Sequence, residues 1–170
     1  STLVAAALSL KDAQKRNFYL DFYLNRDTVV DGCGQLSLPS ASKLWFTPDG
    51  HWKEPGGYHN YPVSKLIEAA LMLENNGYQI FNQYPILLNA SYVMLKYSFP
   101  DLTASAFGDT GRPRQSMECL ESAILMADKY QLPILPDLLN AAMILEQAGQ
   151  YDRSKSGLTG LLCYLPELPK

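Results

Sequence analysis

Residues 62–77 read PVSKLIEAALMLENNG, and this stretch decides the fold class. Its apolar residues return every three or four positions, the spacing that places side chains on one face of an α-helix. These apolar residues are Val63, Leu66, Ile67, Ala70, Leu71 and Leu73. Gly77 follows Asn75 and Asn76, as is typical of a helix C-terminus. We therefore expect an amphipathic helix that starts after Pro62 and ends near Gly77.

The same apolar period returns further along the chain. A helix is expected over residues 79–97, with its start set near Pro85 because proline cannot donate a helical hydrogen bond. Another helix is expected from Met117 to about Tyr130, and the next one around Leu135 to Met143. Residues 157–164 form a short apolar segment before a tail flanked by prolines. The C-terminal half of the chain is thus predicted to be helical.

Toward the N-terminus, apolar residues at helical spacing predict one amphipathic helix that runs to about Leu24. Its inner face is expected to carry Leu3, Ala7, Leu10, Phe18 and Phe22. No long stretch alternates as a strand does. Successive helices with one apolar face and short connections predict an all-α fold of antiparallel helical hairpins. A solenoid and a toroid both fit this pattern, although the lack of a fixed repeat period argues against a tandem-repeat solenoid.

Composition narrows the classes of partner. The 170 residues are 47% hydrophobic, enough for one sizeable core and a single domain. The formal net charge is -3, and no basic run is long enough to neutralise a nucleic-acid backbone. No apolar stretch reaches the roughly 18–20 residues that a membrane-spanning helix needs. We therefore expect neither a nucleic-acid nor a membrane partner.

The three cysteines, Cys33, Cys119 and Cys163, lie far apart and lack metal-ligand spacing. They are expected to be buried free thiols, with no disulfide framework and no zinc site. We expect no cofactor. The chain starts at Ser1 directly before an apolar helical pattern, so it is expected to be a fragment of a longer protein.

The helical period vanishes between residues 27 and 61. Glycines and prolines interrupt any regular element there, and they are Gly32, Gly34, Pro39, Pro48, Gly50, Pro55, Gly56 and Gly57. A long irregular loop is therefore expected over residues 27–61. Such long connections are uncommon in compact domains and are often functional.

The part of this loop from Trp45 to Tyr61 holds both histidines and both tryptophans of the chain. Aromatic faces stack on sugar rings, while histidine, asparagine, glutamate and tyrosine bind hydroxyl and carboxylate groups. The cluster is therefore typical of a carbohydrate cleft. A purely structural role, with aromatic side chains anchoring the loop, is the alternative. A metal site made by His51, Glu54 and His59 is disfavoured because no helical i, i+4 pair organises the ligands.

Two ordered motifs add a resemblance to a known family. The stretches 48–54 (PDGHWKE) and 57–61 (GYHNY), followed by 107–110 (FGDT), resemble signatures of heparinase II/III-like polysaccharide lyases and related alginate lyases. The resemblance covers nearly the whole chain. It implies that residues 1–170 are the C-terminal part of an α/α toroid, and that the enzyme cleaves uronic-acid polysaccharides by β-elimination.

The resemblance also implies roles for individual residues. Tyr58 is the expected proton-transferring tyrosine, with Tyr61 as the fallback. A tyrosine pKa near ~10 must be lowered by positive charge or a donated hydrogen bond before the phenol acts as a base. His59 and His51 are expected to bind the substrate carboxylate or to tune that phenol. Substrate contacts or supporting roles are expected for Trp45, Trp52, Glu54, Arg112 and Asp109, the last as a helix cap or loop brace.

Some parts of the family pattern are missing from the chain. The carboxylate-neutralising Asn or His is expected at or before Ser1, and a further histidine is expected in β-sandwich material downstream. The fragment alone is therefore expected to be inactive, and the rest of its own chain is an expected partner beside the acidic polysaccharide. The resemblance implies periplasmic or secreted action.

Two other function classes stay open. An α/α-toroid glycoside hydrolase needs two carboxylates roughly 5–10 Å apart, and Glu54 and Asp109 are the loop candidates. A non-catalytic helical scaffold that binds a glycan or a protein is the third class.

Overall fold

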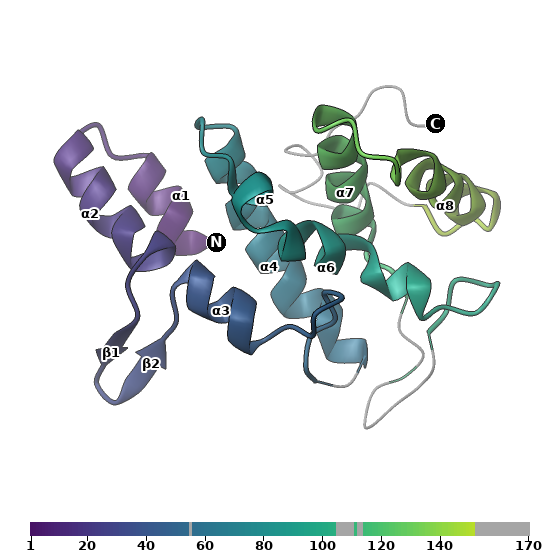
Figure 1. Ribbon diagram of the computed structural model, residues 1–170, viewed down its shortest axis with the longest axis horizontal. Coiled ribbons are helices and arrows are strands. Elements are labelled where there is room, and N and C mark those ends of the chain that lie inside the picture. Colours follow the sequence, from purple (N-terminus) through teal and green to yellow (C-terminus); the bar gives the residue numbers. More distant parts are fainter. Residues whose placement is uncertain (55, 105–110, 112–113, 152–170) are drawn as a thin grey trace.

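The computed structural model describes residues 1–54, 56–104, 111 and 114–151 (Figure 1). This part of the chain is mostly helical, with eight helices and one two-stranded antiparallel hairpin. The expected all-α class is confirmed at this level. None of the described helices is long and apolar enough to cross a membrane.

Two short helices replace the single N-terminal helix that was expected. Helix α1 spans Thr2–Leu8 and α2 spans Ala13–Leu24. The Asp12 carboxylate accepts hydrogen bonds from the backbone N–H groups of Gln14 and Lys15, so this residue starts a new helix. Helix α2 buries Leu20 and Tyr23, whereas Phe18 is 51% exposed. The expectation that Phe18 lies on the inner face was wrong.

The segment 27–61 is more regular than expected. Strands β1 (Thr28–Val30) and β2 (Cys33–Gln35) pair as a hairpin, and α3 spans Leu38–Leu44. The hairpin turns at Asp31 and Gly32, which both have positive φ, the backbone geometry of tight two-residue hairpin turns. The prediction of one long structureless loop was therefore wrong, and the longest described stretch without a helix or a strand in this segment is residues 45–54.

Helix α4 spans Gly56–Glu74 and begins seven residues before residue 63, where it was expected to start. Pro62 lies inside it as its seventh residue. Because proline has no N–H group, the helix lacks one intrahelical hydrogen bond there, to the carbonyl four residues earlier. Because of the early start, Tyr58, His59 and Tyr61 belong to the first turns of α4 instead of a loop.

The later helices agree with the expected pattern. Gly77 adopts φ +88° after α4, and the next segment divides into α5 (Ile80–Gln83) and α6 (Pro85–Lys96), so Pro85 does open a helix. Helices α7 (Met117–Lys129) and α8 (Leu135–Gln147) follow. Residues 157–164 lie outside the described part of the chain.

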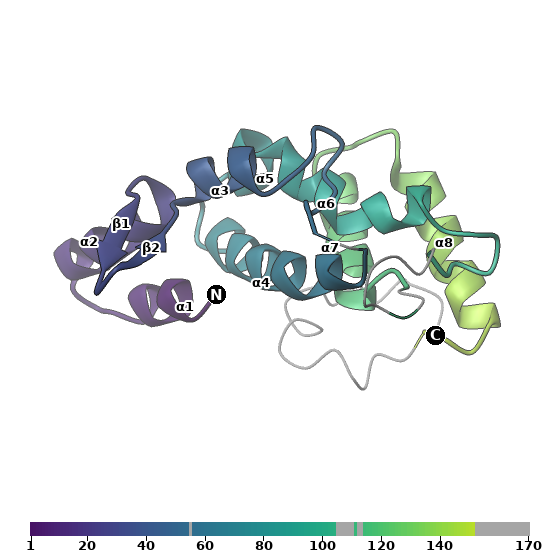
Figure 2. The same ribbon diagram turned by 90° about the horizontal axis from the view of Figure 1, so that it is seen from below.

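One hydrophobic core connects α1 to α8 and includes Val4, Ile67, Leu87, Leu120 and Leu138. Helix α4 contacts α1, α6 and α7, and Figure 2 shows α3, α5 and α6 lying above it. The loop between α3 and α4 therefore packs beside α6. Cys119 is buried as expected, Cys33 is exposed, contrary to expectation, and Cys163 lies outside the described residues.

Candidate functional site

The loop that follows α3 closes on itself as a tight turn. Phe46 and Trp52 form an antiparallel bridge, and Thr47 donates its N–H to the carbonyl of His51 at 2.8 Å. The Thr47 hydroxyl donates to Asp49 Oδ1 at 2.5 Å and accepts from the N–H of His51 at 3.0 Å. These local bonds fix the backbone of the turn, so the aromatic side chains beside it have a rigid base.

Gly50 lies at the tip of this turn and against α6. Its φ is +97°, and a Cβ atom placed on it would lie 2.7 Å from the backbone nitrogen of Ala90. Such a distance is shorter than any ordinary contact, and a left-handed backbone is costly for residues with a side chain. Only glycine allows the turn to approach the helix this closely.

His59 locks the turn to α6 from the other side. Its Nδ1 accepts the N–H of Trp52 at 3.0 Å, so its Nε2 carries the proton and donates to the carbonyl of Ala90 at 2.9 Å. The side chain is 1% exposed, and burial lowers its pKa to about 4. Both ring nitrogens of His59 thus bind backbone groups, an arrangement that positions neighbours and leaves neither nitrogen to a substrate.

His51 lies next to His59, with 5.0 Å between the ring centroids. Its Nδ1 donates to the carbonyl of Trp52 at 2.6 Å, and its ring meets that of Tyr97 edge-on. The Tyr97 hydroxyl in turn donates to Asp49. Hydrogen bonds from Thr47 and then from Tyr97 lower the pKa of Asp49 to about 2. The turn therefore carries a fixed negative charge held by two hydroxyl groups.

The aromatic side chains of the loop lie together. The rings of Trp45 and Trp52 are 5.2 Å apart, and Phe46 meets Trp52 edge-on at 5.5 Å. The indole N–H of Trp52 donates to Glu54 Oε2 at 2.9 Å. Phe46 is buried, Trp52 is half-buried and Trp45 is 36% exposed. The anchoring role expected for these aromatics holds for Phe46, while Trp45 presents an accessible face.

Two of the expected site residues, Tyr58 and Tyr61, are exposed to solvent. They are 45% and 76% exposed and lie one turn apart in the first turns of α4. Asn60 lies between them and donates from Nδ2 to the carbonyl of Arg114 at 2.6 Å. Its Oδ1 is buried and has no hydrogen-bond partner in the described part of the chain. This helix end thus presents two phenols to solvent beside an anchored turn.

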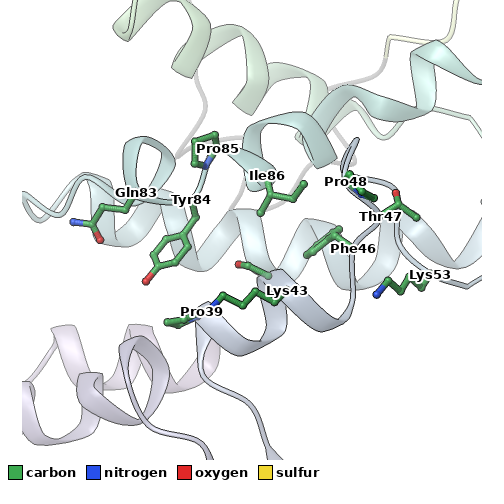
Figure 3. Close-up of a pocket in the computed structure, with 11 residues that line it drawn as sticks. Pro39, Lys43, Phe46, Thr47, Pro48, Lys53, Gln83, Tyr84, Pro85 and Ile86 are labelled. Carbon is green, nitrogen blue, oxygen red and sulfur yellow. The ribbon is translucent and has the colours of Figure 1, made fainter.

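Sequence reasoning missed a groove between α3, the turn and the α5–α6 junction. It has a volume of about 730 Å³ and includes Lys43, Lys53 and Tyr84 in its lining (Figure 3). None of the expected site residues that the structure describes lines it. No signal in the sequence pointed to this groove, because its residues come from three separate elements and form no motif.

Some expected residues lie outside the description. Asp109 and Arg112, with the rest of the 107–110 motif, fall in segments that the structure does not describe. Among the residues that it does describe, no three His, Cys, Asp or Glu side chains gather closely enough to hold a metal ion. Comparison of the chain with models of known protein families, with curated proteins and with solved structures finds no significant match.

Proposed function

We propose that this chain is part of an α/α-toroid polysaccharide lyase that cleaves uronic-acid polysaccharides by β-elimination. The observation that carries the proposal is the exposure of Tyr58 and Tyr61 at the start of α4, beside a turn fixed by Gly50 and His59. Rigid support of this kind lets a side chain hold a reacting atom in one place. The sequence motifs supply the substrate class.

In the proposed reaction, Tyr58 removes the proton from C5 of the uronate. The electron pair of the C5–H bond forms the C4=C5 double bond, the C4–O4 bond breaks, and a proton is delivered to the leaving O4. Tyr58 or Tyr61 supplies that proton. General acid–base catalysis of this type contributes roughly 10²- to 10⁴-fold to the rate.

Other loop residues have supporting roles in this proposal. Trp45 offers an exposed ring face for a sugar, and Glu54 fixes the indole of Trp52. His59 acts as a positioning residue, because its ring nitrogens bind the backbone of Trp52 and Ala90. His51 supports the same cluster through its ring contact with His59. The proposal also includes action in the periplasm or outside the cell.

The test measures turnover of uronic-acid polysaccharides by the full-length protein that contains this chain. Ultraviolet absorbance reports the unsaturated product, and a Tyr58→Phe variant is expected to lose at least about 100-fold in kcat. Tyr19→Phe, which removes a hydroxyl from an exposed tyrosine of α2, serves as the matched control.

Other outcomes of this test would indicate a different catalytic residue or a different function. Full activity of the Tyr58→Phe variant would overturn the role of Tyr58, and Tyr61→Phe would then be measured. New reducing ends without new ultraviolet absorbance would indicate a hydrolase. Absence of any turnover in the parent protein would favour a non-catalytic scaffold.

A further inference from the structure

The groove seen in Figure 3 lies apart from the exposed tyrosines of α4. Its volume of about 730 Å³ falls within the roughly 300–1,000 Å³ of typical small-molecule sites. Residues of α3 and the following turn form one side, with Lys43, Phe46 and Lys53. Tyr84, Pro85 and Ile86 of the α5–α6 junction form the other side. The groove is therefore built from a helix, a fixed turn and a proline-marked helix start.

The charge of the groove is positive in a chain whose formal net charge is -3. Lys43 and Lys53 line it, and the described residues of the lining include no aspartate or glutamate. Figure 3 shows Lys43 on α3 near Pro39 and Lys53 below Thr47, so the two lysines lie toward different ends of the groove. An anionic group in the groove would face walls whose described residues carry two cations and no carboxylate.

Hydroxyl groups add a second, independent sign of a ligand. Ser42 lines the groove, and its buried Oγ has no hydrogen-bond partner among the residues that the structure describes. A buried hydroxyl without a partner is costly, so a polar atom that enters the groove would satisfy it. The Thr47 hydroxyl, in contrast, already bonds Asp49 and the backbone of His51.

Apart from Gln83 and Tyr84, the remaining wall is apolar. Carbon atoms of prolines, a phenylalanine and an isoleucine line it, and these residues are Pro39, Phe46, Pro48, Pro85 and Ile86. Such a surface favours an apolar ligand over a hydroxyl-rich sugar, because contact with the apolar ligand removes more apolar surface from water.

We propose that this groove binds a small carboxylate with an apolar body, such as an aryl-alkyl acid. The carboxylate lies beside Lys43 and reaches the Ser42 hydroxyl, Lys53 adds a second positive charge toward the other end of the groove, and the apolar body covers Phe46, Pro48 and Ile86. This binding site is separate from the proposed lyase site and does not depend on that activity.

The probe is 4-phenylbutyrate, titrated into the whole protein and followed by NMR shifts of the Ile86 and Thr47 methyl groups. Its matched neutral analogue is 4-phenylbutyramide. The acid is expected to bind at least tenfold more tightly than the amide. A Lys43→Met/Lys53→Met double variant is expected to remove that preference, whereas Lys15→Met on exposed α2 is expected to keep it.

A Ser42→Ala variant separates ligand binding from a structural role. It is expected to unfold at the same or a higher urea concentration than the parent, because it removes an unpartnered buried hydroxyl, yet to bind the acid more weakly. Equal affinity for the acid and the amide would overturn the proposal. So would tighter binding of glucuronate than of 4-phenylbutyrate, or shifts confined to residues outside the groove.

Discussion

At the scale of single residues, Gly50 sets the distance between the turn and α6. Replacing it with alanine combines a positive φ of +97° with a Cβ atom 2.7 Å from the backbone nitrogen of Ala90. We expect Gly50→Ala to lower the free energy of unfolding by roughly 2–4 kcal/mol, from backbone strain and overpacking. Urea unfolding followed by circular dichroism measures this loss.

Gly34→Ala is the matched control for that substitution. Gly34 lies in β2, and a Cβ atom there would meet nothing within 4 Å. Its change in unfolding free energy is expected to stay within about 0.5–1 kcal/mol. A Gly50→Ala protein as stable as the Gly34→Ala protein would show that the turn does not depend on its close approach to α6.

His59 makes stability depend on pH. Burial lowers its pKa from the usual 6.5 of a histidine to about 4 in the folded chain. Between these two values the unfolded chain binds a proton that the folded chain does not, so the free energy of unfolding falls as pH falls from 6.5 toward 4. The loss ends below the folded pKa, where both states are protonated.

We therefore expect stability to drop by about 2–3 kcal/mol between pH 7 and pH 4.5 through this group. A His59→Gln variant, less stable at pH 7, lacks this titration, so its stability difference from the parent shrinks by that amount at pH 4.5. Urea unfolding of both proteins at the two pH values measures the change. Asp49 does not interfere, because its lowered pKa of about 2 acts only below pH 3.8. Parallel pH profiles for the two proteins would contradict this account.

The candidate site was partly predictable from single residues. Residue types alone singled out residues 45–61, since both tryptophans and both histidines gather there. The burial of His59 was not predictable, because its partner Ala90 lies 31 positions away in the chain. Lys43 and Lys53, the cations of the groove, were missed for a similar reason. They line the same groove as Tyr84 only after the chain has folded.

At the scale of helices, one buried carboxylate joins three elements. Glu74 at the end of α4 accepts the N–H of Phe81 in α5 at 3.0 Å, and it binds Lys129 and the Tyr130 hydroxyl at the end of α7. The hydrogen bond that Lys129 donates to Glu74 is the main cause of the raised pKa of Lys129. Glu74→Gln leaves these groups with a neutral, poorly matched partner. We expect a loss of roughly 2–4 kcal/mol in the free energy of unfolding.

An ion pair on the same helix with one exposed partner gives the contrast. Lys65 lies 3.1 Å from the buried Glu68 and has 56% of its own side chain exposed, so Lys65→Met is expected to cost less than Glu74→Gln. A Glu74→Gln/Lys129→Met double variant is expected to lose less than the sum of its single variants, because they share one interaction. Strict additivity in chemical unfolding would show that the pair is not coupled.

Helices were predictable where nearby residues in the sequence are enough to determine them. The period after Pro62, the glycine at position 77 and the proline at position 85 each identified an element boundary or interior. The start of α4 was misplaced, because Pro62 is tolerated inside the helix. The break before α2 was missed as well, since the capping by Asp12 competes with an apolar period that continues across it.

At the scale of the whole molecule, burial is uneven along the chain. Figure 1 places α1, α2 and the β1–β2 hairpin at one end, while α4, α6 and α7 lie in the middle. Helix α6 buries seven of its 12 residues and α7 buries eight of its 13, whereas α2 buries two of its 12. The proposed lyase face and the groove both rest on the well-buried middle part, through the contact of the turn with α6.

This distribution predicts the order in which the molecule opens. Amide hydrogens of segments with few buried contacts exchange through local openings, whereas those of the core need a larger unfolding event. In native-state hydrogen exchange with mass spectrometry, we expect peptides from α6 and α7 to exchange at least tenfold more slowly than peptides from α2 and the hairpin. Low urea concentrations should speed exchange of α6 and α7 together, while exchange of α2 changes little. Equal protection of α2 and α6 would mean that the chain opens as one unit, and that the hairpin end is held as firmly as the helix that supports both sites.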